Sequence, residues 1–433
     1  MDRGVTIGLL GLGTVGSGVI RIISEHQAEL HHQIGCPVEI GRVLVKDKLK
    51  QRDFDIDELK LTENAADVLT DPTINVVIEV MGGVKESRQH ITDALRNKKH
   101  VVTANKDLMA LYGAELLKVA EENGCDLFYE ASVAGGIPVI RGLTEGLASD
   151  RITKMMGIVN GTTNYILTKM SEDGRDYEDV LKEAQALGFA ESDPTSDVEG
   201  LDAARKMAIL ATLGFSMNVD LEDVIVRGIT TVTTEDMNYC EQLGYKLKLI
   251  GLAKRKDGRA ELTVQPMLLP LNHPLAAVQN EYNAVYIYGE AVGETMFYGP
   301  GAGSLPTATA VVSDLVTVIK NMRLGVSGRS IHSPLHRKQL QTDEDIESKY
   351  FLRLHVKDET GSFAALTSLF AKENVSFEKL LQWPLEEEVK TAEVVIITHT
   401  TNRAVYERIY KALEDMDVVI DVKSSYRVEG GQS

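Results

Sequence analysis

Apolar residues in the first part of the chain come in short runs, separated by segments with helical spacing. The runs lie at residues 5–10, 38–45, 75–80, 99–104 and 125–131. Helical spacing is found over residues 17–29, 86–98 and 112–123. Because short apolar runs predict buried strands, this part of the chain alternates strand and helix. Such alternation predicts a parallel sheet with a ligand crevice at the carboxyl ends of its strands.

The middle of the chain is less regular. Strands are predicted over residues 150–159, 224–229, 246–254 and 260–268, and a helix over 201–213. Alternation at residues 284–288 predicts a half-exposed strand that could support a dimer. We therefore expect residues 134–306 to form an α+β domain for substrate binding and dimerisation.

The last third of the chain contains a helix, a linker and a new domain. A predicted helix at 307–322 is apolar on most faces, so we expect it to complete the first domain, residues 1–133. Residues 323–348 are polar and lack periodicity, as in a linker. Residues 349–428 then read strand, helix, strand, strand, helix, strand, which predicts an independent ferredoxin-like domain.

A glycine motif follows the first predicted strand and opens the first helix. Its residues are Gly11, Gly13 and Gly16 in the spacing GxGxxG. In this context Gly11 permits a tight turn, Gly13 leaves room for a pyrophosphate and Gly16 lets helix and strand pack. The motif predicts a Rossmann-type dinucleotide-binding domain; a glycine-rich turn that binds nothing is the alternative.

The end of the second predicted strand bears on the choice of nucleotide. An acidic residue there binds the ribose 2′-hydroxyl of NAD, whereas a basic one accommodates the 2′-phosphate of NADP. Lys46, Lys48 and Lys50 surround Asp47. The sequence favours NADP and leaves NAD open.

An acidic stretch at residues 188–206 is our candidate for the chemistry. Its charged residues include Glu191, Asp193, Asp197, Glu199, Asp202 and Lys206. Asp202 and Lys206 are four apart, so on a helix they share a face. The alternative is a solvated loop with a surface ion pair that contributes about 0.3–0.5 kcal/mol. We favour the chemical interpretation because a dinucleotide site needs a polar substrate to meet it.

Three further segments carry candidate groups. Lys106 directly follows a buried strand at the crevice rim, although a snorkelling structural lysine is the alternative. Residues 130–138 combine a carboxylate with a turn rich in exposed carbonyls, which suits a hard cation, although a plain turn is favoured. Residues 160–164, Asn-Gly-Thr-Thr-Asn, begin a helix and either bind a ligand or cap.

Composition narrows the class of protein. The 433 residues include 46 Lys plus Arg against 64 Asp plus Glu, and the net charge of -18 disfavours binding to nucleic acid or an anionic membrane. The chain has no apolar run long enough for a membrane span and no signal-peptide pattern at its start. Cys36, Cys125 and Cys240 suggest neither a disulfide framework nor a metal site. We expect a reduced, cytoplasmic protein.

With these motifs in hand, the chain resembles homoserine dehydrogenases that carry a C-terminal ACT regulatory domain. The resemblance covers nearly the full length, and its most specific parts are residues 11–16, 103–106, 130–138 and 188–206. It implies reversible NAD(P)H-dependent reduction of L-aspartate 4-semialdehyde to L-homoserine, on the route to threonine, methionine and isoleucine.

The resemblance also implies roles for particular residues. Lys206 would donate the proton to the substrate oxygen, and Lys106 would lie by cofactor and substrate. Substrate binding is implied for Glu191, Asp202 and Gly188, nucleotide binding for Gly13, Thr14, Val15, Thr103, Lys106 and Gly303, and sodium binding for Glu130, Val133, Gly135 and Ile137.

Regulation and assembly are further implications of the resemblance. ACT domains commonly open with Asp-x-Pro-Gly, whereas this chain has Asp358-Glu-Thr360-Gly361 without the proline. An amino-acid effector such as threonine, and a homodimer or homotetramer, are expected.

Two other functions are compatible with parts of the pattern. A phosphorylating aspartate-semialdehyde dehydrogenase needs a thiolate nucleophile, and none of the three cysteines is well placed for this. A catalytically silent sensor would pair a dinucleotide domain with an amino-acid-binding domain, but it would not need two lysines at the crevice.

Overall fold

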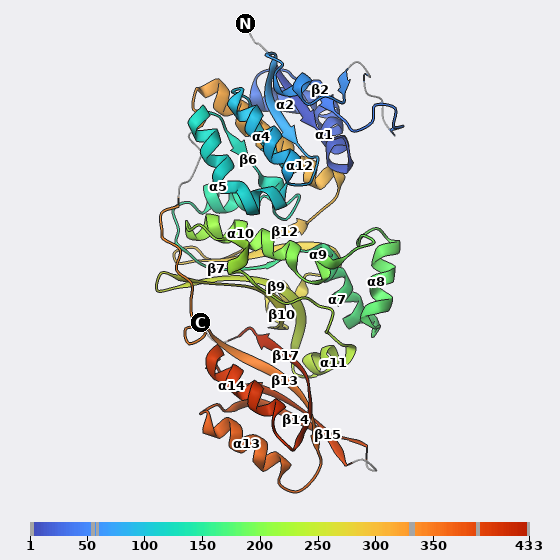
Figure 1. Cartoon of the computed structure of the whole chain (residues 1–433), viewed down its shortest axis with the longest axis vertical. Helices are drawn as coiled ribbons and strands as arrows, with labels where there is room; N and C mark the ends of the chain where they lie inside the picture. The colour runs from blue at the N-terminus through green and yellow to red at the C-terminus, as the bar shows by residue number, and fades with distance from the viewer. Residues whose placement is uncertain (1–3, 53–56, 58–59, 329–333, 387–389, 431–433) are drawn as a thin grey trace. The chain divides into compact units, whose positions relative to one another are not determined.

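A computed structural model describes residues 4–52, 57, 60–328, 334–386 and 390–430 of the chain (Figure 1). The chain forms two compact units. Unit 1 comprises Met1–Thr153, Arg205–Asp223 and Asn283–Lys338, and unit 2 comprises Lys154–Ala204, Val224–Tyr282 and Gln339–Ser433. Within the described residues, no helix is both long enough and apolar enough to span a bilayer.

Unit 1 contains a parallel sheet in the order β3-β2-β1-β4-β5-β6. Its strands are β1 (Val5–Leu10), β2 (Val38–Leu44), β3 (Leu61–Thr62), β4 (Ile74–Glu79), β5 (His100–Thr103) and β6 (Leu127–Phe128). The strand order reverses between β1 and β4, which places a crevice at their carboxyl ends. The predicted Rossmann-type sheet is confirmed.

Helices cover both faces of this sheet. They are α1 (Thr14–Glu25), α2 (Gln27–Ile34), α3 (Ala66–Leu69), α4 (Lys85–Arg96), α5 (Lys106–Asn123) and α12 (Ser304–Leu324). Side chains of α1, α2 and α12 share one hydrophobic core with β1 and β4. Right-handed crossovers on the two sides of β1 place α4 and α5 on the opposite face.

Two predictions for unit 1 are corrected by the structure. The helix expected over 17–29 is two helices with His26 between them, and the change of direction brings Leu30 and Ile34 into the core. The strand expected over 125–131 is only β6, because the Glu130 N–H donates to the Asp314 carboxylate at 2.8 Å instead of continuing a ladder.

Further elements of unit 1 lie outside the parallel sheet. Strands β11 (Tyr282–Gly289) and β12 (Gly293–Pro300) follow each other, and the short helix α6 (Val139–Arg141) follows the loop at 130–138. Ala284, Val285, Tyr286 and Ile287 are all buried. The prediction of a half-exposed strand at 284–288 is therefore wrong, since the strand is covered on both faces.

Unit 2 is built on one mixed sheet in the order β7-β9-β10-β17-β13-β15-β14. Its first strands are β7 (Ile152–Ile158), β9 (Tyr245–Lys256) and β10 (Arg259–Pro270). The predicted strand at 224–229 is only β8 (Ile225–Val226). The helices are α7 (Gly161–Asp173), α8 (Tyr177–Ala186), α9 (Thr195–Val198), α11 (Thr234–Gln242) and the start of α10 (Leu201–Phe215), which continues into unit 1.

The C-terminal part of unit 2 has the predicted βαββαβ order. Its elements are β13 (Glu347–Lys357), α13 (Ser362–Lys372), β14 (Phe377–Glu386), β15 (Thr391–Thr398), α14 (Arg403–Glu414) and β17 (Val419–Val428). Leu366, Phe370, Ile409 and Leu413 of the helices pack on the sheet in a separate core. The ferredoxin-like prediction is confirmed, and β17 also pairs with β10.

Candidate active site

The glycine motif turns tightly after β1 and leaves open space beside α1. Gly11 has a φ of 101°, and a Cβ there would lie 2.8 Å from the Val80 carbonyl oxygen. A Cβ on Gly16 would lie 2.3 Å from the Gly11 oxygen, whereas a Cβ on Gly13 would meet no atom within 4 Å. No side chain caps α1, so the N–H groups of its first turn remain available to a phosphate.

A cavity of about 200 Å³ lies beside this motif. It is lined by Val15, Val80, Gly82, Ala104, Asn105, Lys106 and Asp107. The lining combines the first turn of α1 with the loops that follow β4 and β5. Lys106 therefore faces the same cavity as Val15, at the crevice rim where the sequence predicted it.

Asn105 and Glu79 were not predicted as site residues, and they stabilise the loop between β5 and α5, at whose end Lys106 begins the helix. The Asn105 side chain accepts a hydrogen bond from the Leu108 N–H at 3.1 Å and donates to the Gly83 carbonyl at 2.6 Å. The Thr103 hydroxyl donates to buried Glu79 at 2.7 Å and accepts from the Asn105 N–H at 3.1 Å. Glu79 could have been found from the sequence, because a carboxylate at the end of an apolar strand is unusual and indicates a specific role.

A second glycine-rich loop, residues 299–303, leads into α12, and the residue that follows it contacts the glycine motif at residues 11–16. The Ser304 hydroxyl donates to the Thr14 carbonyl oxygen at 2.7 Å. Gly303, with a φ of 117°, precedes it at the start of α12. Gly303 and the glycine motif therefore belong to one loop cluster in unit 1.

The segment after β2 is basic and solvent-exposed. Lys46 is exposed, whereas the Asp47 carboxylate accepts from the Leu49 N–H at 2.8 Å. The Arg52 guanidinium donates to the carbonyls of Asp47 at 2.9 Å and Lys50 at 2.7 Å, which adds a cation that the sequence analysis missed. The Asp47 carboxylate thus accepts a hydrogen bond within its own turn, and the charged residues on either side of it in the sequence are basic.

Lys206 lies in α10 and is only 9% exposed. Its neighbour Arg205 forms an ion pair with Asp107, with 2.9 Å between Nε and Oδ1. Asp107 in turn follows Lys106. Each candidate lysine is therefore adjacent in sequence to one member of this ion pair in unit 1.

The five carboxylates of the acidic stretch have different surroundings in unit 2. Gly188, with a φ of 77°, and Glu191 lie on an exposed turn after α8. Asp193 accepts hydrogen bonds from Thr195, which hold the pKa of its carboxyl below the usual value, and Glu199 meets the Thr230 hydroxyl at 3.3 Å.

Asp197 and Asp202 are brought together by one side chain. The Asn160 amide donates to Asp197 at 2.7 Å and to Asp202 at 2.8 Å. Asp202 is 2% exposed. These two carboxylates of the acidic stretch are therefore oriented by a shared hydrogen-bond donor.

The predicted cation loop surrounds a buried carboxylate. Glu130 is 4% exposed and accepts from the N–H groups of Ile140 at 2.8 Å and Arg141 at 2.7 Å. Burial raises the pKa of Glu130, and those N–H groups oppose the shift. Beside it, burial raises the pKa of Asp314 to about 8, although the Arg141 guanidinium donates to that carboxylate at 3.0 Å.

Two of the four predicted sodium ligands are uncommitted carbonyls. Among the described residues, the buried carbonyls of Val133 and Gly135 accept no hydrogen bond, whereas the Glu130 carbonyl accepts from Val133 and that of Ile137 from Val139. The part of the chain that the structure describes contains no cluster of three His, Cys, Asp or Glu side chains able to hold a metal. A cation at this loop would therefore depend on carbonyl oxygens.

The three cysteines are buried and free. Burial raises the pKa of Cys125 to about 11 and that of Cys240 well above its usual value. Since a thiolate is the reactive form, neither is suited to nucleophilic catalysis. None of the three lines the cavity beside Lys106.

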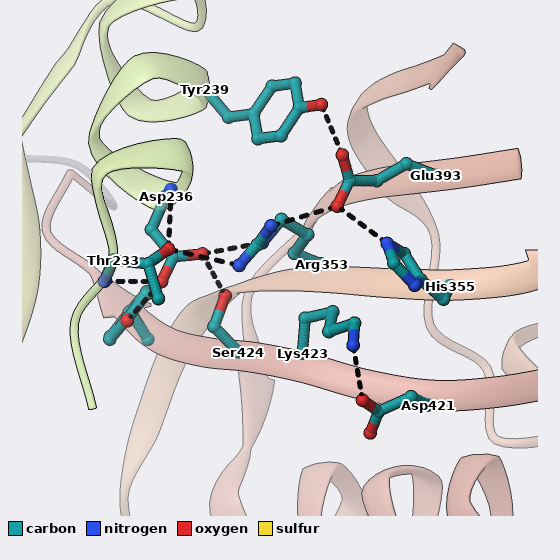
Figure 2. A network of polar contacts seen from close by, with 10 residues as sticks. Thr233, Asp236, Tyr239, Arg353, His355, Glu393, Asp421, Lys423 and Ser424 are labelled. Carbon is teal, nitrogen blue, oxygen red and sulfur yellow. Dashed lines mark hydrogen bonds and ion pairs between the residues drawn. The ribbon is translucent and has the colours of Figure 1, made fainter. Parts of the chain in front are cut away.

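A second polar cluster joins α11 to the C-terminal sheet. Figure 2 shows Arg353 of β13 between Asp236 of α11 and Glu393 of β15, at 2.8 and 3.0 Å. Tyr239 donates to Glu393, and Tyr426 donates to Asp236 at 2.8 Å. Periodicity carries no signal for this cluster, because its members come from α11 and from three different strands that are far apart along the chain.

Comparison with known proteins agrees with these features. Residues 11–130 match the family model described as homoserine dehydrogenase, NAD binding domain, and residues 138–316 match that of homoserine dehydrogenase. Residues 350–417 match the ACT domain. The first match includes the glycine motif, the second includes the acidic stretch, and the third lies in the ferredoxin-like part of the chain.

Individual relatives extend over the whole chain. A homoserine dehydrogenase of Bacillus subtilis (strain 168) is 63% identical over 428 residues, 99% of each chain. The structure of a homoserine dehydrogenase from Thiobacillus denitrificans has a TM-score of 0.91 at 38% identity and covers 99% of this chain and 98% of that one. A hyperthermophilic archaeal homoserine dehydrogenase in complex with NADPH has a TM-score of 0.62 at 27% identity, over 73% of this chain and 98% of that one. This chain belongs to the homoserine dehydrogenase family and carries a C-terminal ACT domain.

Proposed function

We propose that Lys206 is the proton donor in the reaction of this family, the reversible reduction of L-aspartate 4-semialdehyde to L-homoserine. The observation that carries the proposal is the Arg205–Asp107 ion pair at 2.9 Å. This pair sets Lys206 beside the segment that holds Lys106, and Lys106 lines the cavity next to the glycine motif.

The chemistry requires a cation where negative charge develops. Bound NAD(P)H supplies the hydride. The aldehyde oxygen gains negative charge during reduction, and the Lys206 ammonium stabilises that charge and donates the proton. Lys106, as a second cation, stabilises the same charge and the bound ligands. In the reverse direction Lys206 accepts the proton from the alcohol.

Substrate binding is assigned to the acidic stretch. The substrate is a small zwitterion, and its ammonium group is recognised by carboxylates. We assign this role to Glu191 and Asp202, with Gly188 beside them. Exposed Glu191 is accessible to an incoming amino acid, and buried Asp202 supplies a fixed charge.

The nucleotide is assigned to the glycine motif and its surroundings. The set is Gly11, Gly13, Thr14, Val15, Gly16, Lys46, Thr103, Lys106 and Gly303. The open space at Gly13 fits a pyrophosphate. The exposed Lys46 and the cation of Arg52 favour NADP over NAD, as does the likeness to an archaeal relative in complex with NADPH.

A sodium ion is assigned to Glu130, Val133, Gly135 and Ile137. The uncommitted carbonyls of Val133 and Gly135 fit a hard cation. A Cβ on Gly135 would lie 2.3 Å from the Gly301 carbonyl, and one on Gly301 would lie 2.1 Å from the Asn283 amide. That amide is buried and has no hydrogen-bond partner among the described residues, so unsatisfied polar groups gather there.

The C-terminal ACT domain indicates regulation by a small molecule. We propose an amino-acid effector such as threonine, assembly as a dimer or tetramer, and the domain boundaries 1–133 with 307–322, 134–306, a linker at 323–348, and 349–428.

A nicotinamide absorbance assay with homoserine tests the assignment of Lys206. Lys206→Ala should lower turnover by roughly 100-fold or more, because the developing charge loses its proton donor, with the affinity for NADPH unchanged. Lys118→Ala removes an exposed lysine of α5 and is the control, with wild-type turnover expected. Near-normal turnover of Lys206→Ala would remove Lys206 from the mechanism, and faster rates with NADH than with NADPH would overturn the nucleotide preference.

A further inference from the structure

Helix α7 begins at a buried asparagine whose side chain makes contacts in two directions. Asn160 is 5% exposed and is the N-cap of α7. Its amide oxygen accepts from the Thr163 N–H at 2.9 Å and from the Thr163 hydroxyl at 3.0 Å. The oxygen side of the amide is thus fully used in capping the helix.

The nitrogen side of the same amide contacts the acidic stretch. One N–H donates to Asp197 Oδ1 at 2.7 Å, and the other donates to Asp202 Oδ2 at 2.8 Å. The opposite orientation of the amide would place its oxygen against two carboxylates and its NH₂ against the Thr163 N–H. The hydrogen-bonding pattern therefore permits only the observed orientation.

The first turn of α7 is itself held in place within unit 2. A Cβ on Gly161 would lie 2.6 Å from the Glu281 carbonyl oxygen, so the backbone at this turn fits closely against residue 281. The Thr162 hydroxyl donates to the Phe189 carbonyl at 2.6 Å, directly after Gly188. Asn164 donates to the Asn280 carbonyl at 2.8 Å. Thr162 thus contacts the start of the acidic stretch, and Asn160 contacts Asp197 and Asp202 in its second half.

We infer that Asn160 is a positioning residue for substrate binding, which fixes the carboxylate of Asp202 through one N–H and that of Asp197 through the other. An amide suits this task because it orients a carboxylate without neutralising it, whereas an arginine would cancel the charge that the substrate ammonium needs. The inference rests on the proposed role of Asp202 in substrate binding. It gives the motif Asn-Gly-Thr-Thr-Asn a function beyond capping.

Asn160→Ser is the informative variant, because serine retains the N-cap but cannot donate to both carboxylates. The KM for homoserine should rise roughly 10-fold or more, since two hydrogen bonds to charged groups are lost, while the KM for NADP stays unchanged. Asn160→Asp retains the cap but turns an oxygen towards Asp197 and Asp202, so a larger rise is expected. Asn160→Thr, which also retains a capping hydroxyl, is the second variant should Asn160→Ser fail to fold.

Asn402→Ser is the matched control. Asn402 caps α14 by accepting from the Val405 N–H at 2.8 Å, and it contacts none of the substrate-binding residues. Its replacement should leave both KM values unchanged and should lower the melting temperature by less than Asn160→Ser does, because the Asn160 side chain also donates to two carboxylates. A KM for homoserine that responds equally in both variants would overturn the inference.

Asp202→Asn separates this inference from the proposed function. If Asp202→Asn does not raise the KM for homoserine, the role of Asp202 itself fails. If it does raise that KM while Asn160→Ser does not, only the positioning role fails. If Asn160 acts through Asp202, the double variant should bind homoserine no more weakly than Asp202→Asn alone, and additive losses would overturn the inference.

Discussion

Two pairs of acidic side chains in unit 2 can be compared, because each pair contacts a single shared side chain of a different kind. Asp197 and Asp202 share the uncharged amide of Asn160. Asp236 and Glu393 share the guanidinium of Arg353. An amide orients negative charge without adding a positive charge, whereas a guanidinium offsets one of the two negative charges. The first arrangement suits recognition of a cationic ligand, and the second suits a structural junction.

The structural junction depends on Arg353 for its charge balance. The side chains of Arg353, Asp236 and Glu393 are 8%, 0% and 4% exposed. His355 lies 3.5 Å from Glu393, but burial and the neighbouring Lys423 lower its pKa, so the imidazole is a poor substitute cation at neutral pH. Arg353 is therefore the cation that both carboxylates contact, and it offsets one of their two negative charges.

The largest effect is expected from Arg353→Met, which leaves two buried carboxylates without their cation. The free energy of unfolding should fall by roughly 3–5 kcal/mol, measured by urea denaturation at pH 7.5. Arg259→Met is the control, since it breaks an ion pair with Asp345 whose side chains are 47% and 36% exposed, and a much smaller loss is expected. Equal losses in the two variants would show that burial of the cluster has no energetic consequence.

A smaller effect is expected from a buried cation that has uncharged partners, the reverse of the Asn160 arrangement. The Lys248 ammonium donates to the Asn164 side chain at 3.0 Å and to the Val278 carbonyl at 2.7 Å. Burial lowers the pKa of Lys248 to about 8. A lysine in the unfolded chain has a pKa of about 10.4, so between these values the unfolded state binds more protons than the folded state.

The sign of the pH dependence follows from that difference. The contribution of Lys248 to stability should rise from pH 8 to pH 10.5 by up to about 3 kcal/mol and should be flat below pH 8. Urea denaturation of wild type and Lys248→Met at several pH values isolates it, because other titrating groups are common to both proteins. Lys118→Met, at an exposed position, is the control. A pH-independent difference between wild type and Lys248→Met would contradict the prediction.

The sequence predicted the parts of the fold that local pattern determines. The runs at 5–10, 38–45 and 75–80 match β1, β2 and β4 to within one residue. β1 and β4 are mostly apolar because they are buried on both faces, whereas β2 includes the exposed side chains of Glu39 and Arg42. Glycine spacing likewise located the tight turn between β1 and α1, because the geometry of this turn depends on residues that are close together along the chain. Strand β11 was misjudged, since burial of its second face depends on another layer that alternation along one strand does not reveal.

The sequence also singled out segments rich in polar groups, but it did not predict which of these groups contact one another. The motif at 160–164 was compatible with capping or with ligand binding, and only the fold shows that Asn160 caps α7 and also contacts Asp202. The contact of Arg353 with Asp236 joins residues more than 100 positions apart. Such pairs depend on tertiary packing, so neither periodicity nor spacing predicts them.

The smallest effect is expected from Tyr239→Phe, which removes one uncharged donor from the Arg353 cluster. Phenylalanine retains the ring contact with Trp383, whose centroid lies 5.0 Å away, and Glu393 keeps its ion pair with Arg353. The free energy of unfolding should fall by about 1.5 kcal/mol in the same urea assay, the lower end of the usual contribution of a hydrogen bond to a charged group. If Tyr239→Phe destabilises the protein as much as Arg353→Met, hydrogen bonding rather than charge compensation stabilises the cluster. The contrast between an uncharged amide and a positively charged guanidinium would then no longer explain how the two acidic pairs are stabilised.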